Sequence, residues 1–255
     1  MDFRDKLLVR PGTTVRLAHW NPDDTLHFSK DEDARDAVAR NIARLDELQY
    51  RLYAERRRAV LIVLQGMDSS GKDGTIRHVM TGLNPQGCRV TAFKEPSPQE
   101  AAHDFLWRVH QVVPQRGDIA IFNRSHYEDV LAARVRKLVP RPVWSARYRT
   151  INRFEEYLAE ENVLVVKFLL HISKAEQKRR LAERLANPMK QWKISADDFA
   201  ARRAWSAYRR AYEDLLTQCS TRHAPWYIIP ANKKWFRDLA VSRILVEVLE
   251  ACHMR

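Results

Sequence analysis

The most informative part of this sequence is Val60-Leu-Ile-Val-Leu-Gln-Gly-Met-Asp-Ser-Ser-Gly-Lys-Asp-Gly74. Its apolar run predicts a buried strand, and the glycine-rich turn that follows leads into a predicted helix. The spacing Gly66-x-x-x-x-Gly71-Lys72 is typical of a P-loop, in which backbone N–H groups and a helix N-terminus bind phosphate oxygens. The stretch therefore predicts a parallel α/β fold with a phosphate ligand.

The loop departs from the usual pattern directly after the lysine. A Ser or Thr commonly stands there and binds Mg²⁺, whereas this chain has Asp73. Asp68, inside the loop, is the predicted metal ligand, because Mg²⁺ is a hard cation that prefers carboxylate and phosphate oxygens. The loop residues predicted to contact phosphate are Gly66, Ser69, Ser70, Gly71, Lys72, Asp73 and Gly74.

The net charge indicates which kinds of partner the protein binds, and the cysteine content indicates its cellular compartment. The 255-residue chain has 44 Lys and Arg against 32 Asp and Glu, a formal net charge of +12. This excess favours a polyanionic partner such as nucleic acid, anionic lipid or a phosphate polymer, although a merely soluble basic protein has the same balance. The 3 cysteines are far apart and give no pattern of a zinc site or disulfide framework. Without a signal-peptide pattern or an apolar run that could span a bilayer, we expect a cytoplasmic protein with no membrane contact.

Five apolar strands alternate with helices along the chain. After the run at Val60, strands are predicted at Arg89–Phe93, Asp118–Phe122, Val163–Leu170 and Trp226–Ile229. Helices are predicted over residues 29–57, 98–112, 142–159, 174–185, 197–217 and 234–252, after an irregular arm at 1–28. Buried strands separated by helices are typical of a parallel sheet covered on both faces. We therefore predict an α/β, three-layer P-loop kinase sandwich with a five-stranded parallel sheet of order 2-3-1-4-5.

A single P-loop kinase domain is predicted over residues 1–255, in four parts. An N-terminal arm and helix (1–57) precede the P-loop core (58–173), and a helical lid at about 174–200 precedes the C-terminal part of the core (201–255). In the lid, Arg180 and Arg184 share a helix face, and an Asn187-Pro188 break precedes Lys190 and Lys193. We expect the lid to close over phosphates and bring arginines to the charge that develops during transfer. A solvated basic helix is the alternative.

A second polar cluster, Asn123-Arg-Ser-His-Tyr-Glu-Asp129, follows the strand at Asp118–Phe122. Ligands of open parallel sheets bind at the carboxyl ends of the strands, so this cluster is expected to face the same crevice as the P-loop. Arg124 suits phosphoryl oxygens because its fork can bind two of them. Asn123 can orient a hydroxyl or a metal-bound water. Glu128 and Asp129 can hold Mg²⁺ through water or orient an acceptor, but for Asp129 an ordinary ion pair is an equal alternative.

Six motifs occur in order along the chain: Gly66–Gly74, Phe93-Lys-Glu-Pro-Ser97, His103–Arg108, Phe122–Val130, Asn187-Pro-x-Lys-x-Trp-Lys193 and Pro225–Trp235. Together they resemble the family-2 polyphosphate kinases, over nearly the whole chain. The resemblance implies transfer of phosphate between inorganic polyphosphate and nucleotides, with Mg²⁺ as cofactor and Mn²⁺ as a substitute. It also implies a cytosolic homo-oligomer, either a dimer or a tetramer.

The segment Asn123-Arg-Ser-His-Tyr-Glu128 resembles the class III branch of that family, which acts on nucleoside mono- and diphosphates. The implied acceptors are AMP and ADP, with ATP as the final product and guanine nucleotides as further acceptors. We predict catalytic roles for Asp68, Lys72, Arg124, Glu128 and Arg184. Beyond the loop, the predicted polyphosphate contacts are Lys94, Arg180 and Arg184, and the predicted nucleotide contacts are Asn123, Arg124, Glu128, Asp129, Lys190 and Lys193.

Two other classes fit part of the pattern. One is a nucleoside monophosphate kinase of the same fold that uses ATP rather than polyphosphate as donor. The other is a nucleic-acid-binding P-loop protein, which the net charge of +12 favours. Such a protein would carry aromatic residues interleaved with Lys and Arg, or a known binding motif. The chain has neither, so no nucleic-acid partner is expected.

Overall fold

The structure is a computed structural model that describes residues 3–30, 32–194 and 196–254. At its centre is a five-stranded sheet made of β1 (Ala59–Gln65), β2 (Cys88–Ala92), β3 (Ile119–Asn123), β4 (Val163–His171) and β5 (Trp226–Pro230). The strands pair in parallel in the order β2-β3-β1-β4-β5, which confirms the predicted sheet. Because the strands share one direction, their carboxyl ends lie along one edge of the sheet.

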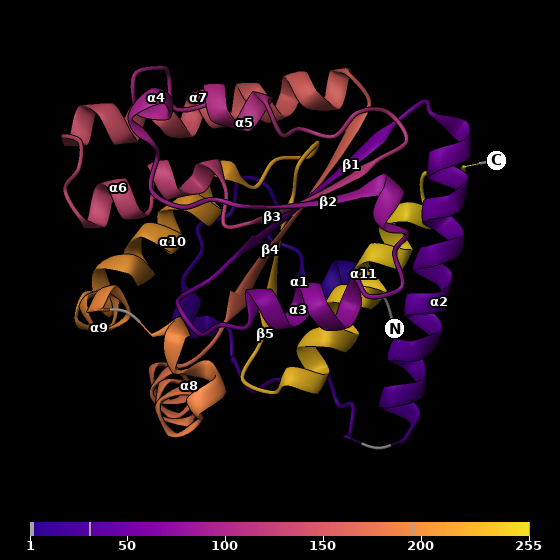
Figure 1. Ribbon diagram of the computed structural model, residues 1–255, viewed down its shortest axis with the longest axis horizontal. Helices are drawn as coiled ribbons and strands as arrows, with labels where there is room; N and C mark the ends of the chain where they lie inside the picture. Colours follow the sequence, from indigo (N-terminus) through magenta and orange to yellow (C-terminus); the bar gives the residue numbers. More distant parts are fainter. Residues whose placement is uncertain (1–2, 31, 195, 255) are drawn as a thin grey trace.

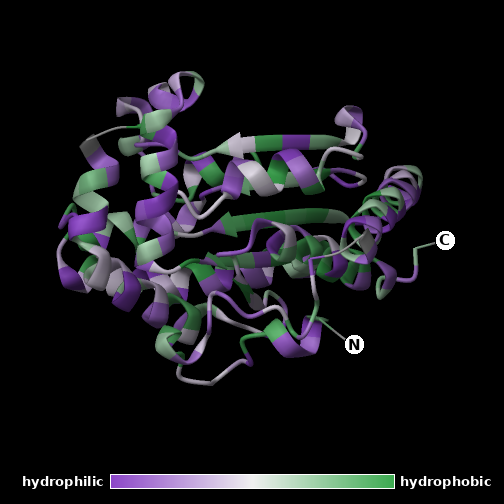
Figure 2. Cartoon of the chain, turned by 90° about the horizontal axis from the view of Figure 1, so that it is seen from below, coloured by the Kyte–Doolittle hydropathy of each residue, from purple (hydrophilic) through white to green (hydrophobic). Residues whose placement is uncertain are grey.

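Two layers of helices cover the sheet, as Figure 1 shows. On one face lie α2 (Glu32–Glu55), α3 (Lys72–Val79) and α11 (Lys234–Glu250); on the other lie α7 (Arg141–Glu160) and α10 (Trp205–Cys219). Every residue of β1 is buried, and alternate side chains enter the two apolar clusters, because successive residues of a strand point to opposite faces. In Figure 2 a central strand is almost wholly in the apolar colour, whereas the helices carry both colours.

Shorter elements connect these layers. The short helices are α1 (Phe3–Leu7), α4 (Pro98–Ala101), α5 (Trp107–His110), α6 (Ala132–Val135), α8 (Lys174–Ala186) and α9 (Ala196–Arg203), and the 3-10 turns η1 to η4 are Leu17–His19, Pro85–Gly87, His126–Asp129 and Pro188–Lys193. The N-terminal arm is more ordered than predicted, since it contains α1 and a bridge from Leu8 to Tyr227 of β5. Among the described residues, we find no helix with the length and apolarity needed to cross a bilayer.

The single helix predicted over 98–112 is wrong. The segment forms the one-turn helices α4 and α5, separated by a turn at His103 and Asp104. The carboxylate of Asp104 accepts a hydrogen bond of 2.9 Å from the backbone N–H of Leu106. Such a local side-chain bond competes with helix continuation, which explains the break.

The single helix predicted over 197–217 is also wrong, because it breaks at Ala204 into α9 and α10. The two halves follow different neighbours. Arg202 in α9 donates a hydrogen bond of 2.7 Å to the carbonyl of Lys174 at the start of α8. By contrast, α10 packs against α7 and joins the apolar cluster on the same face of the sheet as α7. The change of direction at Ala204 satisfies both contacts.

Candidate active site

The loop between β1 and α3 has the backbone that the glycine pattern predicts. Gly66 and Gly71 have φ of 155° and 108°, a region that favours glycine. A Cβ atom at Gly66 would lie 2.6 Å from Ser70 Oγ and 2.7 Å from the carbonyl oxygen of Leu170, and one at Gly71 would overlap Nη1 of Arg237. Ser69 takes the left-handed conformation without being glycine, with φ of 66°. The loop is therefore tightly wound, and neither glycine can be replaced without displacing its neighbours.

The open end of the loop, which we call its mouth, has donor groups from Ser69, Ser70 and Lys72 that suit an anion. Lys72, only 8% exposed, donates hydrogen bonds to the loop carbonyls of Gly66 (2.8 Å) and Met67 (3.4 Å). The hydroxyl oxygens of Ser69 and Ser70 are buried and have no hydrogen-bond partner among the described residues. Burial, followed by the nearby Arg124 guanidinium, lowers the pKa of Lys72 to about 8, and the nearby carboxylates oppose this shift. A phosphate group here would pair with the ammonium and offer acceptors to the hydroxyls.

Arg124 joins the loop to the polar cluster after β3. Its Nη2 lies 2.5 Å from Oδ1 of Asp68, and its Nη1 lies 3.8 Å from Oε2 of Glu128. Although burial alone would lower the pKa of Arg124, the carboxylates of Glu128 and Asp68 raise it. Burial raises the pKa of Glu128, although Arg124 and Lys72 oppose this shift. Lys72, Asp68, Arg124 and Glu128 therefore meet as the sequence predicted.

Oxygen donors that suit Mg²⁺ are present at this mouth. The carboxylates of Asp68, Asp73 and Glu128 all act electrostatically on Lys72, and Asp73 Oδ1 accepts a hydrogen bond of 2.9 Å from Nδ2 of Asn123. No cluster of three acidic, histidine or cysteine side chains that could hold a metal occurs within residues 3–30, 32–194 and 196–254. Mg²⁺ is usually bound through one or two carboxylates together with substrate phosphates rather than by an all-protein cage. The donors at the mouth of the loop fit that mode of binding.

Asp129 lies away from the loop and takes part in a different contact. Its Oδ1 accepts a hydrogen bond of 3.0 Å from Arg147, and its Oδ2 lies 3.8 Å from Nη2 of Arg108. This is the ordinary ion pair that the sequence left open for Asp129. Lys94 is exposed, and its carbonyl accepts a hydrogen bond of 2.9 Å from Arg108.

The predicted lid residues occupy three different environments. Arg180 is buried, and its five N–H groups are all used by Oε1 of Glu176 and by the carbonyl oxygens of Ser69, Ser70, Ala231 and Asn232. It therefore braces the P-loop against the loop after β5 and has no N–H left for a phosphate. Arg184 is half-buried and Lys190 is exposed, while the side chain of Lys193 lies outside the described residues.

A buried ionic network that the sequence did not reveal supports the turn after β3. Lys167 of β4, in the middle of an apolar strand, donates to Glu155 (2.5 Å), the hydroxyl of Tyr127 (2.8 Å) and the carbonyl of Cys219 (2.8 Å). His126 Nε2 lies 3.2 Å from Oε1 of the same glutamate. Although burial alone would raise it, the Lys167 ammonium lowers the pKa of Glu155. The network anchors η3 and hence the position of Glu128.

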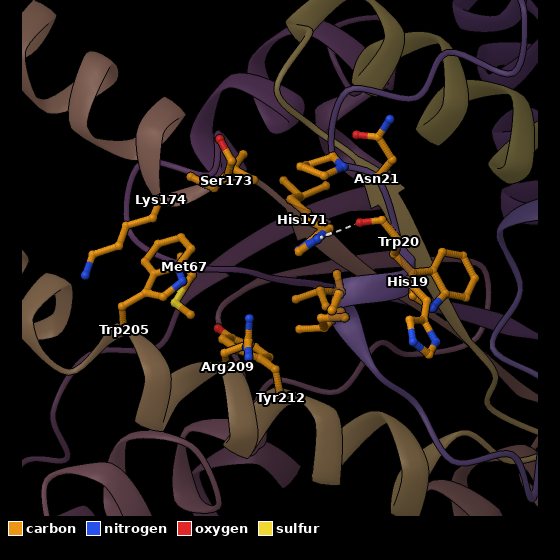
Figure 3. Close-up of a pocket in the computed structure, with 16 residues that line it drawn as sticks. His19, Trp20, Asn21, Met67, His171, Ser173, Lys174, Trp205, Arg209 and Tyr212 are labelled. Carbon is orange, nitrogen blue, oxygen red and sulfur yellow. Dashed lines mark hydrogen bonds between the residues drawn. The ribbon is translucent and has the colours of Figure 1, made fainter.

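A cavity of about 430 Å³ adjoins the loop at the carboxyl end of β4 (Figure 3). Met67 lines it on the loop side, and residues 17–22 of the N-terminal arm form another wall. His171 Nε2 lies 3.1 Å from the carbonyl oxygen of Trp20, which ties this arm to β4. Lys174 and Arg209 are among the described lining residues, and no Asp or Glu is. The N-terminal arm thus belongs to the surroundings of the P-loop.

Comparison with known proteins shows to which family this chain belongs. The family model described as "Polyphosphate kinase 2 (PPK2)" matches residues 27–255. A protein of Meiothermus ruber named AMP/ADP-polyphosphate phosphotransferase is 53% identical over 251 residues, which cover 98% of this chain and 94% of that protein. The ADP-polyphosphate phosphotransferase of Rhodopseudomonas palustris is 42% identical over 258 residues, covering 96% and 89%.

A solved structure agrees with these sequence matches. The crystal structure of polyphosphate kinase 2 from Arthrobacter aurescens TC1 superposes with a TM-score of 0.95 at 40% sequence identity. The match covers 100% of this chain and 91% of that one. The similarity therefore extends over the sheet, both helical layers and the segment from α8 to α9.

Proposed function

Since the chain belongs to the polyphosphate kinase 2 family, we propose that it transfers the terminal phosphoryl group of inorganic polyphosphate to AMP and ADP. The relatives that match along nearly their whole length carry names for transfer between polyphosphate and AMP or ADP. Transfer to AMP gives ADP, and transfer to ADP gives ATP.

The observation that supports this function most strongly is the meeting of Lys72 and Arg124 at the mouth of the loop. Phosphoryl transfer needs little covalent chemistry from a protein, because positioning and neutralisation of charge dominate. The acceptor atom of AMP or ADP is a phosphate oxygen, which is already anionic and needs no general base. Lys72 and the loop N–H groups would hold the end of the polymer. Arg124, whose Nη2 lies 2.5 Å from Asp68 Oδ1, would bind oxygens of the transferred group through its fork.

Mg²⁺ is the proposed cofactor, with Mn²⁺ as a substitute. When bound, it would neutralise charge on the phosphate oxygens of both substrates. Asp68 remains a proposed ligand, and the oxygen donors of Asp73 and Glu128 beside it support this choice.

The segment from α8 to α9 is the proposed lid. Its base is attached to the P-loop through Arg180 and through Gln177, which donates a hydrogen bond of 3.1 Å to the carbonyl of Asp68. Its far part is exposed, including Met189 (81%) and Trp192 (78%). A segment held at its base and exposed at its tip is suited to close over a bound polymer, with Arg184 and Lys190 as its cations. The homo-oligomer, the cytoplasmic location and the use of guanine nucleotides stay predictions from the resemblance.

A donor-substitution assay tests the function. The protein is incubated with AMP, Mg²⁺ and long-chain polyphosphate without ATP, in the presence of an adenylate kinase inhibitor, and nucleotides are separated by chromatography. We expect ADP first and ATP afterwards. The Lys72→Ala variant should be slower by about 10²–10³-fold, the usual loss of one charge-stabilising group, whereas Lys6→Ala, which alters an exposed lysine of α1, should match the wild type.

Two outcomes would count against the proposal. Formation of ADP only when ATP is added would identify the ATP-dependent nucleoside monophosphate kinase instead. Equal rates for the wild type and Lys72→Ala would show that the loop is not where transfer takes place.

A further inference from the structure

One buried side chain joins the strand before the P-loop to the turn that carries Arg124. Gln65 is the last residue of β1 and directly precedes Gly66, and its side chain is fully buried. Its Nε2 donates a hydrogen bond of 3.2 Å to Oγ of Ser125, which lies 60 positions further along the chain. The carboxamide therefore crosses from β1 to the turn after β3, the neighbouring strand, and connects the two parts of the site.

Ser125 fixes the start of this turn. It is fully buried, and its Oγ also accepts a hydrogen bond of 3.2 Å from the backbone N–H of Tyr127 in η3. The preceding residue, Arg124, has φ of 61°, a left-handed conformation that persists in a residue other than glycine only where its surroundings fix it. On one side, its N–H donates a hydrogen bond of 3.0 Å to the carbonyl of Leu64. On the other side, the bond from Gln65 holds Ser125 in place.

Gln65 also reaches the guanidinium end of Arg124, through Glu128. Burial raises the pKa of the Glu128 carboxyl. The nearby cations and, to a smaller degree, a hydrogen bond from the Gln65 side chain oppose this rise. An ionised carboxylate can only accept hydrogen bonds, so the amide N–H of Gln65 is the donor. Because Oε2 of Glu128 lies 3.8 Å from Nη1 of Arg124, both contacts of Gln65 lead to Arg124, one to its backbone and one to its guanidinium.

The other end of the carboxamide lowers the stability of the fold. Oε1 of Gln65 is buried and has no hydrogen-bond partner among the residues that the structure describes. An unpaired buried oxygen destabilises a protein, and an apolar side chain of the same shape would remove that penalty. Stability alone therefore does not explain a carboxamide at this position, whereas its contacts with Ser125 and Glu128 point to a role in the site.

We propose that Gln65 is a positioning residue, which holds Arg124 in its left-handed conformation and directs its guanidinium toward the P-loop. The inference rests on the proposed function and deepens it, because Arg124 is the group proposed to bind oxygens of the transferred phosphoryl group. Lys72 and the loop N–H groups hold the end of the polymer whether or not Arg124 is well placed. Loss of the carboxamide should therefore slow the transfer step and leave polyphosphate binding nearly unchanged.

The variant Gln65→Met tests this role, because methionine has nearly the shape of glutamine but no N–H or C=O group. Gln49→Met is the matched control. Gln49 is also buried, but its Oε1 and Nε2 are both bonded to the backbone of Asn84, at 2.6 Å and 2.9 Å. Asn84 directly precedes η2 at the amino end of β2, the edge of the sheet opposite the site. For each protein we measure kcat for transfer to AMP, the Kd of polyphosphate by calorimetry without nucleotide, and the melting temperature.

We expect the two variants to change opposite properties. Gln65→Met should lower kcat by at least about tenfold and change the Kd of polyphosphate by less than about threefold. Its melting temperature should equal or exceed that of the wild type, because the unpaired oxygen is removed. Gln49→Met should have a lower melting temperature, because the N–H and C=O of Asn84 lose their partner, and a kcat within about twofold of the wild type. In crystals of Gln65→Met, the Arg124 guanidinium should no longer lie beside Asp68.

The outcomes separate the inference from the function on which it rests. A Gln65→Met variant with a kcat within about threefold of the wild type would show that the carboxamide is not needed for transfer. A loss of kcat together with a lower melting temperature and weaker polyphosphate binding would indicate a merely structural role and overturn the inference. An unchanged Arg124 in crystals of a slow variant would overturn it as well. A wild type that cannot use polyphosphate would instead overturn the proposed function.

Discussion

The pH dependence of polyphosphate binding depends on Lys72. Burial lowers the pKa of this ammonium to about 8 in the free protein, and Arg124 adds to the shift. Bound phosphates would hold the proton, so only the protonated form binds well. As pH rises from about 7 to about 9, the protonated fraction falls from about nine-tenths to about one-tenth, and the association constant should fall about tenfold.

Titration calorimetry with long-chain polyphosphate, at constant ionic strength and without nucleotide, measures this effect. At a pH of about 8, binding should also take up about half a proton, which shows as a difference in heat between buffers of unlike ionisation enthalpy. Lys72→Arg is the matched control, since a guanidinium stays charged throughout this range. It should remove both the pH dependence and the proton uptake. Equal affinity of the wild type at both pH values, or the same pH dependence in Lys72→Arg, would show that the charge on Lys72 does not control polyphosphate binding.

Three further changes test other parts of the structure. Lys167→Met leaves the buried carboxylate of Glu155 without its cation. This change should lower the free energy of unfolding, measured by urea denaturation, by about 3–5 kcal/mol. The double variant Lys167→Met/Glu155→Gln should recover most of the lost stability, and failure to do so would contradict the stabilising role of this ion pair. Gly71→Ala adds a Cβ that overlaps the buried Arg237 at a φ of 108°, so it should lose most activity and about 1–3 kcal/mol of stability, and wild-type behaviour would argue against the wound loop. Polyphosphate affinity should fall by about 10³-fold between about 50 and about 500 mM salt if about four phosphates are neutralised, and a flat response would exclude a cationic groove.

The sheet and the loop were predictable because they rest on local patterns. Apolar runs bounded by turns mark the strands, and the spacing Gly66-x-x-x-x-Gly71-Lys72 specifies a backbone that other residues hardly adopt. The convergence of Arg124 and Glu128 on the loop follows from the rule that parallel strands end at one edge. The helix breaks at Asp104 and Ala204 were not predictable from periodicity, because they depend on a side-chain bond and on neighbouring helices.

The roles of several charged residues depended on partners distant in sequence. Arg180 looked like a free lid cation, yet its N–H groups are used by carbonyls of two loops that only the fold brings together. The role of Lys167, which lies in an apolar strand, could not be predicted because its partner Glu155 lies on α7. Asp73 departs from the usual P-loop pattern, but its hydrogen bond with Asn123 depends on the register of β3 beside β1. Sequence gave the residue types at the site, and tertiary contacts assigned their partners.

A crystal structure of the protein with a short linear polyphosphate would locate the bound polymer relative to the loop. We predict phosphate groups in the loop Gly66–Gly71, within hydrogen-bond distance of Lys72 Nζ and the hydroxyls of Ser69 or Ser70, with Lys72 released from the carbonyls of Gly66 and Met67 that it now contacts. A polymer bound elsewhere, while Lys72 stays hydrogen-bonded within an empty loop, would show that transfer does not take place at this loop.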